Sequence, residues 1–173
     1  MNFDTAVVQT RYQSPLGSII IAATAKGLAG LWFDDQRHLP RELVGPAVWP
    51  NDPDHPVLKK VISQLTGYFS GQRSSFDIPL DLAYGTAFQQ SVWQALLKIP
   101  QGGTASYGEV SQRIGKPAAV RAVGAAVGRN PVSIIVPCHR VMGAGGALTG
   151  YAGGLERKSA LLKLEGVALE GAR

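Results

Sequence analysis

The chain has 173 residues, 45% of them hydrophobic and 17% charged, and its formal net charge is +5 at pH 7. These values are typical of a compact globular protein with one domain or two small ones, and they exclude a long disordered tail. The N-terminal segment has no basic and apolar leader, and no apolar run reaches the length of a membrane span. We therefore expect a cytoplasmic protein with no membrane contact.

The first half of the chain is predicted to form a small antiparallel sheet. Residues 7–12, 18–24 and 28–33 are short segments rich in β-branched and aromatic residues, and turn-forming residues separate them. From residue 34 to residue 56, prolines and charged side chains interrupt every pattern, which predicts a long irregular connection.

A helix is predicted next, because apolar residues recur at helical spacing over residues 57–69, directly after Pro56 and before Gly71. Residues 75–80 are predicted to return to a strand, and residues 81–85 to form the hinge before a mainly helical second half. The expected class is α+β, with a supporting domain at residues 1–82 and a second domain at residues 86–173.

The second half is predicted to begin with a helix capped by Thr86 and ended by the turn that starts at Pro100. Its apolar face should bury Phe88, Val92, Trp93, Leu96 and Leu97.

A helix-turn-helix is predicted after this helix. Ser106 and Glu109 have the spacing of a capping box for a helix over residues 107–114, and Pro117 suits the first turn of a helix over residues 118–128. The second of these helices carries one long polar side chain, Arg121; its other positions include Ala118, Ala119, Ala122, Gly124, Ala125 and Ala126. Such a smooth helix either packs closely on a neighbour or approaches a nucleic-acid groove closely, and the residues alone leave both readings open.

The only cysteine, Cys138, lies at the end of an apolar run that we interpret as strand-like, and His139 and Arg140 follow it directly. Cationic neighbours lower the pKa of a cysteine and favour a nucleophilic thiolate. The alternative is a small buried hydrophobic residue. With one cysteine and three scattered histidines the chain has no metal-ligand spacing, so we expect no metal, and it has no motif for any other cofactor.

Three motifs around this cysteine resemble the active-site block of the O6-alkylguanine-DNA alkyltransferases, the methylated-DNA–protein-cysteine methyltransferase family. They are Asn130-Pro131, Ile135-Val136-Pro137-Cys138-His139-Arg140-Val141, and Gly150-Tyr151-Ala152-Gly153-Gly154-Leu155. The resemblance covers residues 86–165 closely and the first half more loosely. It implies a DNA repair protein that flips O6-alkylguanine out of the duplex and moves the alkyl group irreversibly to Cys138, once per molecule, with O4-alkylthymine as a second candidate substrate.

The resemblance also assigns roles to individual residues. His139 is the base, acting through water, and Glu165 orients its imidazole; Tyr107 binds the guanine ring, and Asn130 braces the turn before Cys138. Without the resemblance, the sequence favours a solvated helix end for Glu165, and Tyr107 has the alternative of a half-buried aromatic residue at a helix start. The substrate pocket is expected to include Tyr107, Val141, Tyr151 and Gly153.

The resemblance further implies a helix-turn-helix that enters the minor groove of double-stranded DNA, with Arg121 inserted beside the displaced nucleotide. Further DNA contacts are expected from Thr86, Gln89, Ser106, Ala119 and Arg129. The expected partner is duplex DNA with an alkylated guanine, bound by a monomer, and cooperative assembly along DNA stays open. Ala152 departs from the family pattern, in which many members have serine, and this puts one hydrogen bond near the substrate O6 in question. Three other classes are less consistent with the sequence: a lesion-recognition module without transfer, a cysteine hydrolase using Cys138, and a transcriptional regulator.

Overall fold

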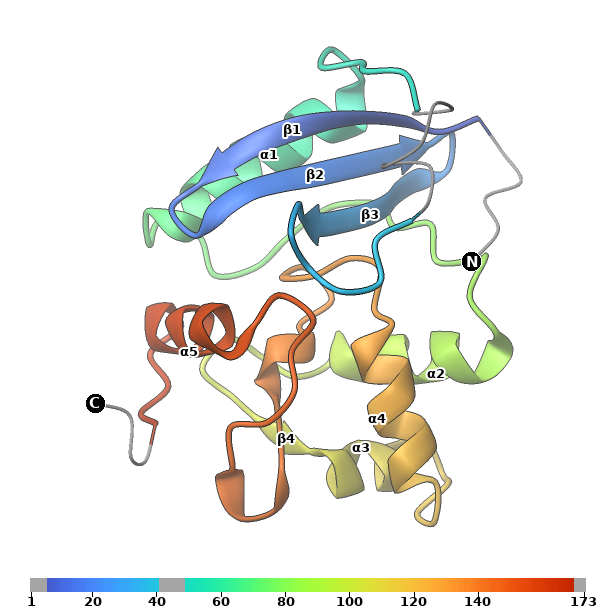
Figure 1. Cartoon of the computed structure of the whole chain (residues 1–173), viewed down its shortest axis with the longest axis vertical. Coiled ribbons are helices and arrows are strands. Elements are labelled where there is room, and N and C mark those ends of the chain that lie inside the picture. Colours follow the sequence, from blue (N-terminus) through green and yellow to red (C-terminus); the bar gives the residue numbers. More distant parts are fainter. Residues whose placement is uncertain (1–5, 41–48, 170–173) are drawn as a thin grey trace. The chain divides into compact units, whose positions relative to one another are not determined.

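The computed structural model describes residues 6–40 and 49–169 of the 173-residue chain, and it divides into two compact units, Met1–Tyr84 and Gly85–Arg173 (Figure 1). The first unit has an antiparallel sheet and one helix, and the second is mainly helical, which confirms the predicted α+β class. The expected irregular connection at residues 34–56 falls partly outside the described residues, because these omit positions 41–48. In the described part of the chain, none of the helices has the length and apolar character needed to cross a membrane.

The sheet of the first unit contains β1 (Val8–Ser14), β2 (Gly17–Thr24) and β3 (Gly27–Phe33), each antiparallel to the next. These bounds agree with the three predicted strands to within two residues. Almost every residue of β2 and β3 is buried, because both faces of the sheet are covered. On one face the Trp32 ring lies over Gly30, where a Cβ would come within 1.9 Å of the indole, and it stacks on Trp49.

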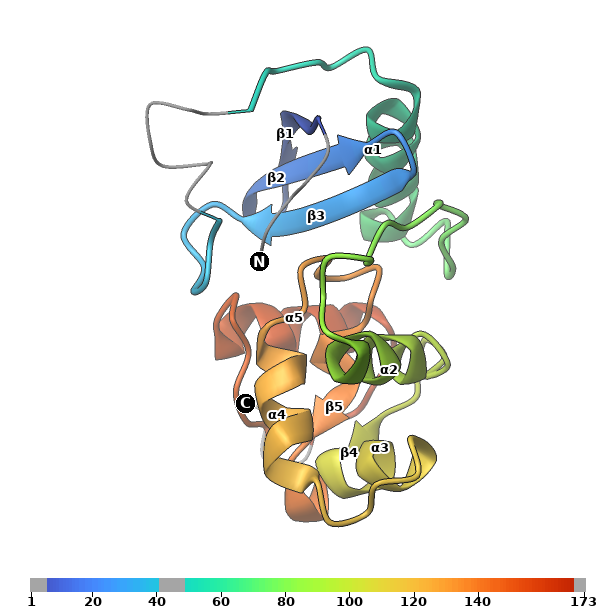
Figure 2. The same ribbon diagram turned by 90° about the vertical axis from the view of Figure 1, so that its right-hand side faces the viewer.

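The helix α1 (Pro56–Phe69) packs along this sheet (Figure 2). It begins at Pro56, one residue before the predicted start, and His55 caps its first turn, with Nδ1 accepting a hydrogen bond from the Val57 N–H at 3.2 Å. Gly71, at a φ of 78°, follows its end. The apolar side buries Leu58, Val61, Leu65 and Tyr68.

The strand predicted at residues 75–80 is wrong: this segment makes one parallel bridge to Leu28 and no ladder. The Leu28 N–H donates to the Pro79 carbonyl at 2.8 Å, but Pro79 has no N–H with which to continue the pairing. The Gln64 side chain instead bonds both backbone groups of Asp77, at 2.9 and 3.2 Å. The segment is therefore extended and held by a side chain rather than by a strand.

The second unit begins with α2 (Ala87–Leu96), and Thr86 caps it as predicted. The Thr86 hydroxyl accepts from the Gln89 N–H at 3.1 Å while the Gln89 side chain accepts from the Thr86 N–H at 3.0 Å. Val92, Trp93 and Leu96 are buried as expected, but Phe88 is only half-buried and Leu97, just past the helix, is 37% exposed. The apolar pattern therefore overestimated the buried face by one residue at each end.

The predicted helix-turn-helix is formed by α3 (Tyr107–Arg113) and α4 (Val120–Gly128), which pack on each other and on α2. The capping box of Ser106 and Glu109 is present, but α4 begins at Val120 rather than at residue 118. Pro117 lies in a turn before the helix, in which the Ala119 N–H bonds the Lys116 carbonyl at 2.9 Å.

The last part of the second unit contains short elements and one longer helix. The two-residue strands β4 (Ala105–Ser106) and β5 (Val141–Met142) pair in parallel, and the 3₁₀ helices η2 (Cys138–Arg140) and η3 (Ala144–Gly146) flank β5. The helix α5 (Leu155–Leu164) follows a glycine-rich loop.

Candidate active site

The site is built around Cys138, the first residue of η2, whose surface is 5% exposed. The run before it is a series of turns and not the predicted strand, since Ile134 has a φ of 72° and the Val136 N–H bonds the Val132 carbonyl at 3.0 Å. A positive φ is unusual for a β-branched residue. The Asn130 side chain holds the turn, donating to the Val136 carbonyl at 2.8 Å and accepting from the Val132 N–H at 3.0 Å.

The expectation of a lowered cysteine pKa is wrong. Burial raises the pKa of Cys138 above its usual value, and hydrogen bonding by Asn130 together with the Lys158 charge only partly offsets this effect. The adjacent cationic residues predict a lowered pKa, but desolvation of the buried thiolate is the larger effect. In the resting structure the thiol therefore keeps its proton at neutral pH, and its reactivity depends on a base.

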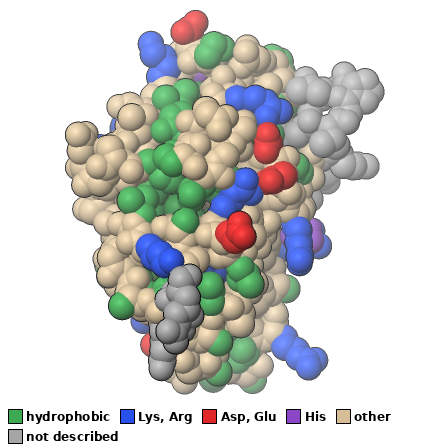
Figure 3. Space-filling view, turned by 60° about the vertical axis from the view of Figure 1, so that its left-hand side comes forward, with side chains coloured by type: hydrophobic (Ala, Val, Ile, Leu, Met, Phe, Trp, Pro, Cys, Tyr) green, Lys and Arg blue, Asp and Glu red, His purple; other side chains and the backbone are tan. Residues whose placement is uncertain are grey.

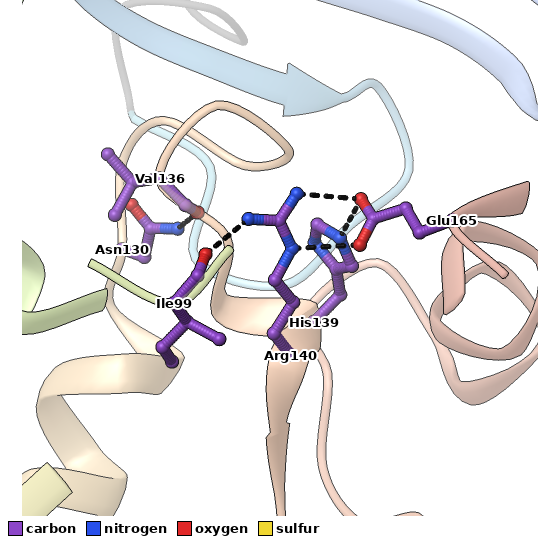
Figure 4. A network of polar contacts seen from close by, with 6 residues as sticks. All are labelled: Ile99, Asn130, Val136, His139, Arg140 and Glu165. Atoms are coloured by element: carbon purple, nitrogen blue, oxygen red, sulfur yellow. Dashed lines mark hydrogen bonds and ion pairs between the residues drawn. The ribbon is translucent and has the colours of Figure 1, made fainter. Parts of the chain in front are cut away.

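His139 and Glu165 form a buried pair (Figure 4). Glu165, the residue after α5, is 6% exposed rather than at a solvated helix end, and its Oε2 lies 2.7 Å from His139 Nε2. Burial lowers the pKa of His139, while the bond to Glu165 and its charge act in the opposite direction. A neutral imidazole at rest has a lone pair available for a proton.

The thiol and the imidazole are not directly bonded. Cys138 and His139 lie in a 3₁₀ turn rather than in an extended segment. Among the described residues, no hydrogen bond joins the two side chains, and His139 Nδ1 is buried without a hydrogen-bond partner. A proton can pass between them only after a small rearrangement or through a bridging water.

Lys158 is a site residue that the sequence reasoning missed. This α5 side chain is fully buried, and its Nζ donates to the carbonyls of Val141, at 2.6 Å, Thr149 and Gly150. Burial lowers the pKa of Lys158 to about 8, and the nearby Cys138 acts against that shift. One signal was present in the sequence, because Lys158 lies three residues before the buried Leu161, on the apolar side of the helix.

The predicted pocket residues come from several elements of the second unit. Tyr107, the first residue of α3, lies against Gly124 of α4, and its hydroxyl would be 3.8 Å from a Cβ added to Gly150. Val141 is buried in β5 next to η2, Gly153 is buried in the loop, and the Tyr151 hydroxyl is buried. Burial raises the pKa of Tyr151, and the proximity of Cys138 adds to the shift, so this residue remains a phenol.

The predicted DNA contacts lie within α2 and α4 or at the ends of α2, α3 and α4. Arg121 and Arg129 are exposed, and Ala119 precedes the first turn of α4. The side-chain oxygens of Thr86, Gln89 and Ser106 already accept capping hydrogen bonds, so the hydroxyl and amide hydrogens are what they offer to a phosphate.

The helix α4, whose small side chains left two interpretations open, is buried on one side and exposed on the other. Val123, Ala126 and Val127 of α4 are buried, and the Ala126 carbonyl accepts a hydrogen bond from Trp93 Nε1 at 2.9 Å. Ala122 and Ala125, by contrast, are exposed. The helix therefore packs through one side and presents small side chains to solvent on the other. On the molecular face shown in Figure 3, basic and acidic side chains are interspersed, so that face does not present one sign of charge.

A DNA-binding type of fold and a buried cysteine beside a His–Glu pair thus occur in one unit, and comparison with known proteins gives the family. Residues 87–167 match the family described as 6-O-methylguanine DNA methyltransferase, DNA binding domain, and residues 7–82 match its ribonuclease-like domain. The methylated-DNA–protein-cysteine methyltransferase of Mycobacterium leprae is 51% identical over 152 residues, which are 88% of each chain. The chain therefore belongs to the methylated-DNA–protein-cysteine methyltransferase family.

Solved structures agree with this assignment. A crystal structure of Mycobacterium tuberculosis OGT in complex with DNA has a TM-score of 0.82 and 47% identity, covering 91% of this chain and 92% of that one. The O6-methylguanine-DNA methyltransferase of Pyrococcus kodakaraensis has a TM-score of 0.63 and 27% identity, covering 93% and 99%.

Proposed function

We propose that this protein repairs O6-alkylguanine in double-stranded DNA by transferring the alkyl group to its own Cys138. The observation that carries the proposal is the buried Cys138 held by the Asn130 turn, next to His139 with its 2.7 Å bond to Glu165. Nucleophile, base and orienting carboxylate are the three parts required to activate a thiol whose pKa is raised by burial.

The reaction balances without a cofactor. The Cys138 thiol gives its proton to His139, and the sulfur attacks the alkyl carbon in line with the bond to O6. The sulfur–carbon bond forms as the carbon–oxygen bond breaks, the electron pair goes to the guanine, and guanine takes up a proton on its ring. The product is a thioether that water does not hydrolyse, so each molecule reacts once.

Tyr107, Val141, Tyr151 and Gly153 form the proposed pocket for the flipped base. The Tyr107 hydroxyl lies near Gly150 of the glycine-rich loop, which supports a role in binding the guanine ring and supplying a proton to it. Ala152 has no hydroxyl to donate to the substrate O6, so this loop offers one hydrogen bond fewer than a serine would give.

For DNA we propose minor-groove binding by a monomer through the helix-turn-helix. The exposed small side chains of Ala122 and Ala125 support close approach of α4 to a groove, and the exposed Arg121 is long enough to replace a flipped nucleotide in the stack. Arg129, Thr86, Gln89, Ser106 and Ala119 are the proposed phosphate contacts, which give affinity that falls with salt and no sequence preference.

The unit Gly85–Arg173 contains all of these residues, and we propose that Met1–Tyr84 supports it. We also propose a cytoplasmic location, because a reactive free thiol persists in the reducing cytosol.

The test is conversion of a single O6-methylguanine in a synthetic duplex. After incubation with limiting protein, the DNA is digested to nucleosides, and O6-methyldeoxyguanosine and deoxyguanosine are quantified. The proposal predicts loss of one modified nucleoside and gain of one deoxyguanosine per protein molecule, with no further turnover. Binding without conversion, or conversion that continues past one equivalent, contradicts it.

A further inference from the structure

Arg140, the last residue of η2, has no role in the reaction described above, yet it is 8% exposed and bonded on all sides. Its Nε donates to Glu165 Oε1 at 2.8 Å, its Nη2 donates to Glu165 Oε2 at 3.1 Å, and its Nη1 donates to the Ile99 carbonyl at 2.6 Å (Figure 4). The guanidinium thus joins the active-site turn, the segment after α2 and the end of α5. Burying a guanidinium is unfavourable unless it is paired. The buried position of Arg140 therefore indicates a specific role rather than a general contribution to the surface charge.

The fork of Arg140 fixes where the imidazole proton lies. Both Glu165 oxygens accept from the guanidinium, and Oε2 also lies 2.7 Å from His139 Nε2. A carboxylate held by a guanidinium stays ionised and can only accept. Nε2 of His139 therefore carries the hydrogen, and the lone pair is on Nδ1, which is buried without a hydrogen-bond partner.

The charges around the imidazole point in the same direction. The groups that face His139 are the Glu165 carboxylate, the Arg140 guanidinium and the Lys158 ammonium, with Cys138 and Tyr151 nearby in their neutral forms. The pKa of His139 is lowered mainly by burial and also by Arg140 and Lys158, against the opposing effect of Glu165. Without Arg140, the negative charge of Glu165 would act on the imidazole with no guanidinium beside it to balance that charge.

We propose that Arg140 is a positioning residue of the transfer reaction, which aims Glu165 at His139 Nε2 and balances its charge, so that His139 rests neutral with Nδ1 ready to accept the thiol proton. This inference rests on the proposed function. The proton leaves Sγ for Nδ1, directly or through one water, and the charged imidazolium exists only until guanine takes up a proton. The carboxylate never receives the proton, because Arg140 holds it in its ionised form.

The test compares two substitutions in single-turnover methyl transfer from an O6-methylguanine duplex, measured from pH 5 to 9. Arg140→Gln removes the charge, so the acid side of the pH–rate profile should move up by about one to two pH units. Arg140→Lys keeps the charge but loses the fork, so the profile should stay in place while the rate falls about tenfold at every pH. Arg11→Gln, which removes an exposed arginine 3.5 Å from Asp34, is the matched control and should change neither.

A second measurement needs no DNA and separates this inference from the proposed function. NMR titration of ¹³C-labelled histidine should show the His139 signal titrating at higher pH in Arg140→Gln than in wild type, with the His38 and His55 signals unchanged. The proposal is overturned if folded Arg140→Gln has the acid side of its pH–rate profile and its His139 titration at the wild-type positions. If Arg140→Gln does not fold, Arg140→Lys decides: a wild-type rate, or a His139 titration moved up, contradicts it. If wild-type protein transfers no methyl group, the proposed function fails, and the histidine titration still tests Arg140.

Discussion

The two units of the protein differ in what they bury. In the described part of Met1–Tyr84 the only buried side chain among Asp, Glu, His, Lys and Arg is that of Asp81, which bonds Thr24 at 2.6 Å. The described part of Gly85–Arg173 buries His139, Arg140, Lys158 and Glu165 within one cluster. Both units bury apolar residues, but only the second concentrates charge around a thiol.

The second unit therefore carries the desolvation cost of burying several ionisable groups. Buried ion pairs are often no more stabilising than apolar residues of the same volume, so a cluster of four ionisable groups is not explained by stability. Strongly perturbed pKa values concentrate at functional sites, as those of Cys138 and His139 do here. Substitutions in the first unit should therefore change stability, while those in the cluster should change chemistry.

The largest expected effect is that of Cys138→Ala, which removes the alkyl acceptor. Transfer should be abolished, while binding to a duplex with O6-methylguanine, measured by fluorescence anisotropy, should stay within about threefold because α4 is untouched. Cys138→Ser, which replaces the thiol with a hydroxyl of similar size, is the matched control for packing. Any residual stoichiometric methylation of Cys138→Ala would contradict the assignment.

Replacing the base should be the next largest effect. His139→Phe should slow single-turnover transfer roughly 10²- to 10⁴-fold. Burial raises the pKa of Cys138, so the thiol needs a proton acceptor, and this substitution removes it. His55→Phe is the control in the first unit. It removes the cap of α1 and should leave the transfer rate of folded protein unchanged. A rate for His139→Phe within a factor of three of wild type would remove His139 from the mechanism.

The first unit is tested by Leu31→Ala, which truncates a fully buried side chain of β3. It should lower the free energy of unfolding by about 2–5 kcal/mol, measured by urea denaturation, without changing the amount of methyl transferred by folded protein. Lys60→Ala, which removes an exposed ion pair to Asp77, should change stability by less than about 1 kcal/mol. A loss of transfer in folded Leu31→Ala would break the division between the two units.

Arg121→Ala should give a smaller and selective effect. The rate with duplex O6-methylguanine should fall about tenfold, equivalent to ~1.4 kcal/mol of the cost of opening the stack, while the rate with free O6-benzylguanine base should not change. Arg113→Ala, which removes an exposed arginine of α3, is the control. Equal losses on duplex and free base would exclude a role for Arg121 in holding the flipped base.

The smallest expected effect is a pH dependence of stability due to Lys158. Because burial lowers its pKa to about 8 from 10.5, the unfolded chain binds more protons than the folded chain between these values, and the free energy of unfolding should rise with pH. The raised pKa of Cys138 acts in the opposite direction, so the comparison uses Cys138→Ala with and without Lys158→Met, from pH 8 to about pH 9.5, below the range of tyrosine ionisation. An equal slope in both proteins would show that Lys158 does not titrate as described.

Local signals in the sequence were sufficient for much of the fold. The first three strands, the Thr86 and Ser106 caps and, to within one residue, the start of α1 depend on residues close in the chain, and the structure has all of them. The segment at residues 75–80 failed because its partner, Gln64, is far in sequence and competes for the backbone.

For the candidate site, the sequence predicted which residues belong to it but not their pKa values or their hydrogen-bond partners. The motif around Cys138 located the thiol, the imidazole and Asn130, and the structure places each of them in the cluster. The pKa of Cys138 was not predictable, because desolvation depends on how the whole unit covers the thiol. The positions of Arg140 and Lys158 depend on carbonyls of Ile99 and Thr149, which no local pattern connects to them.

The most direct test of the central claim is mass spectrometry of the protein after reaction with a duplex that carries one O6-methylguanine. The account predicts a mass gain of one methyl group per molecule, which peptide mapping assigns to Cys138 and which excess substrate does not increase. An unchanged mass despite tight binding of the lesion, or a methyl group on any other residue, would contradict it.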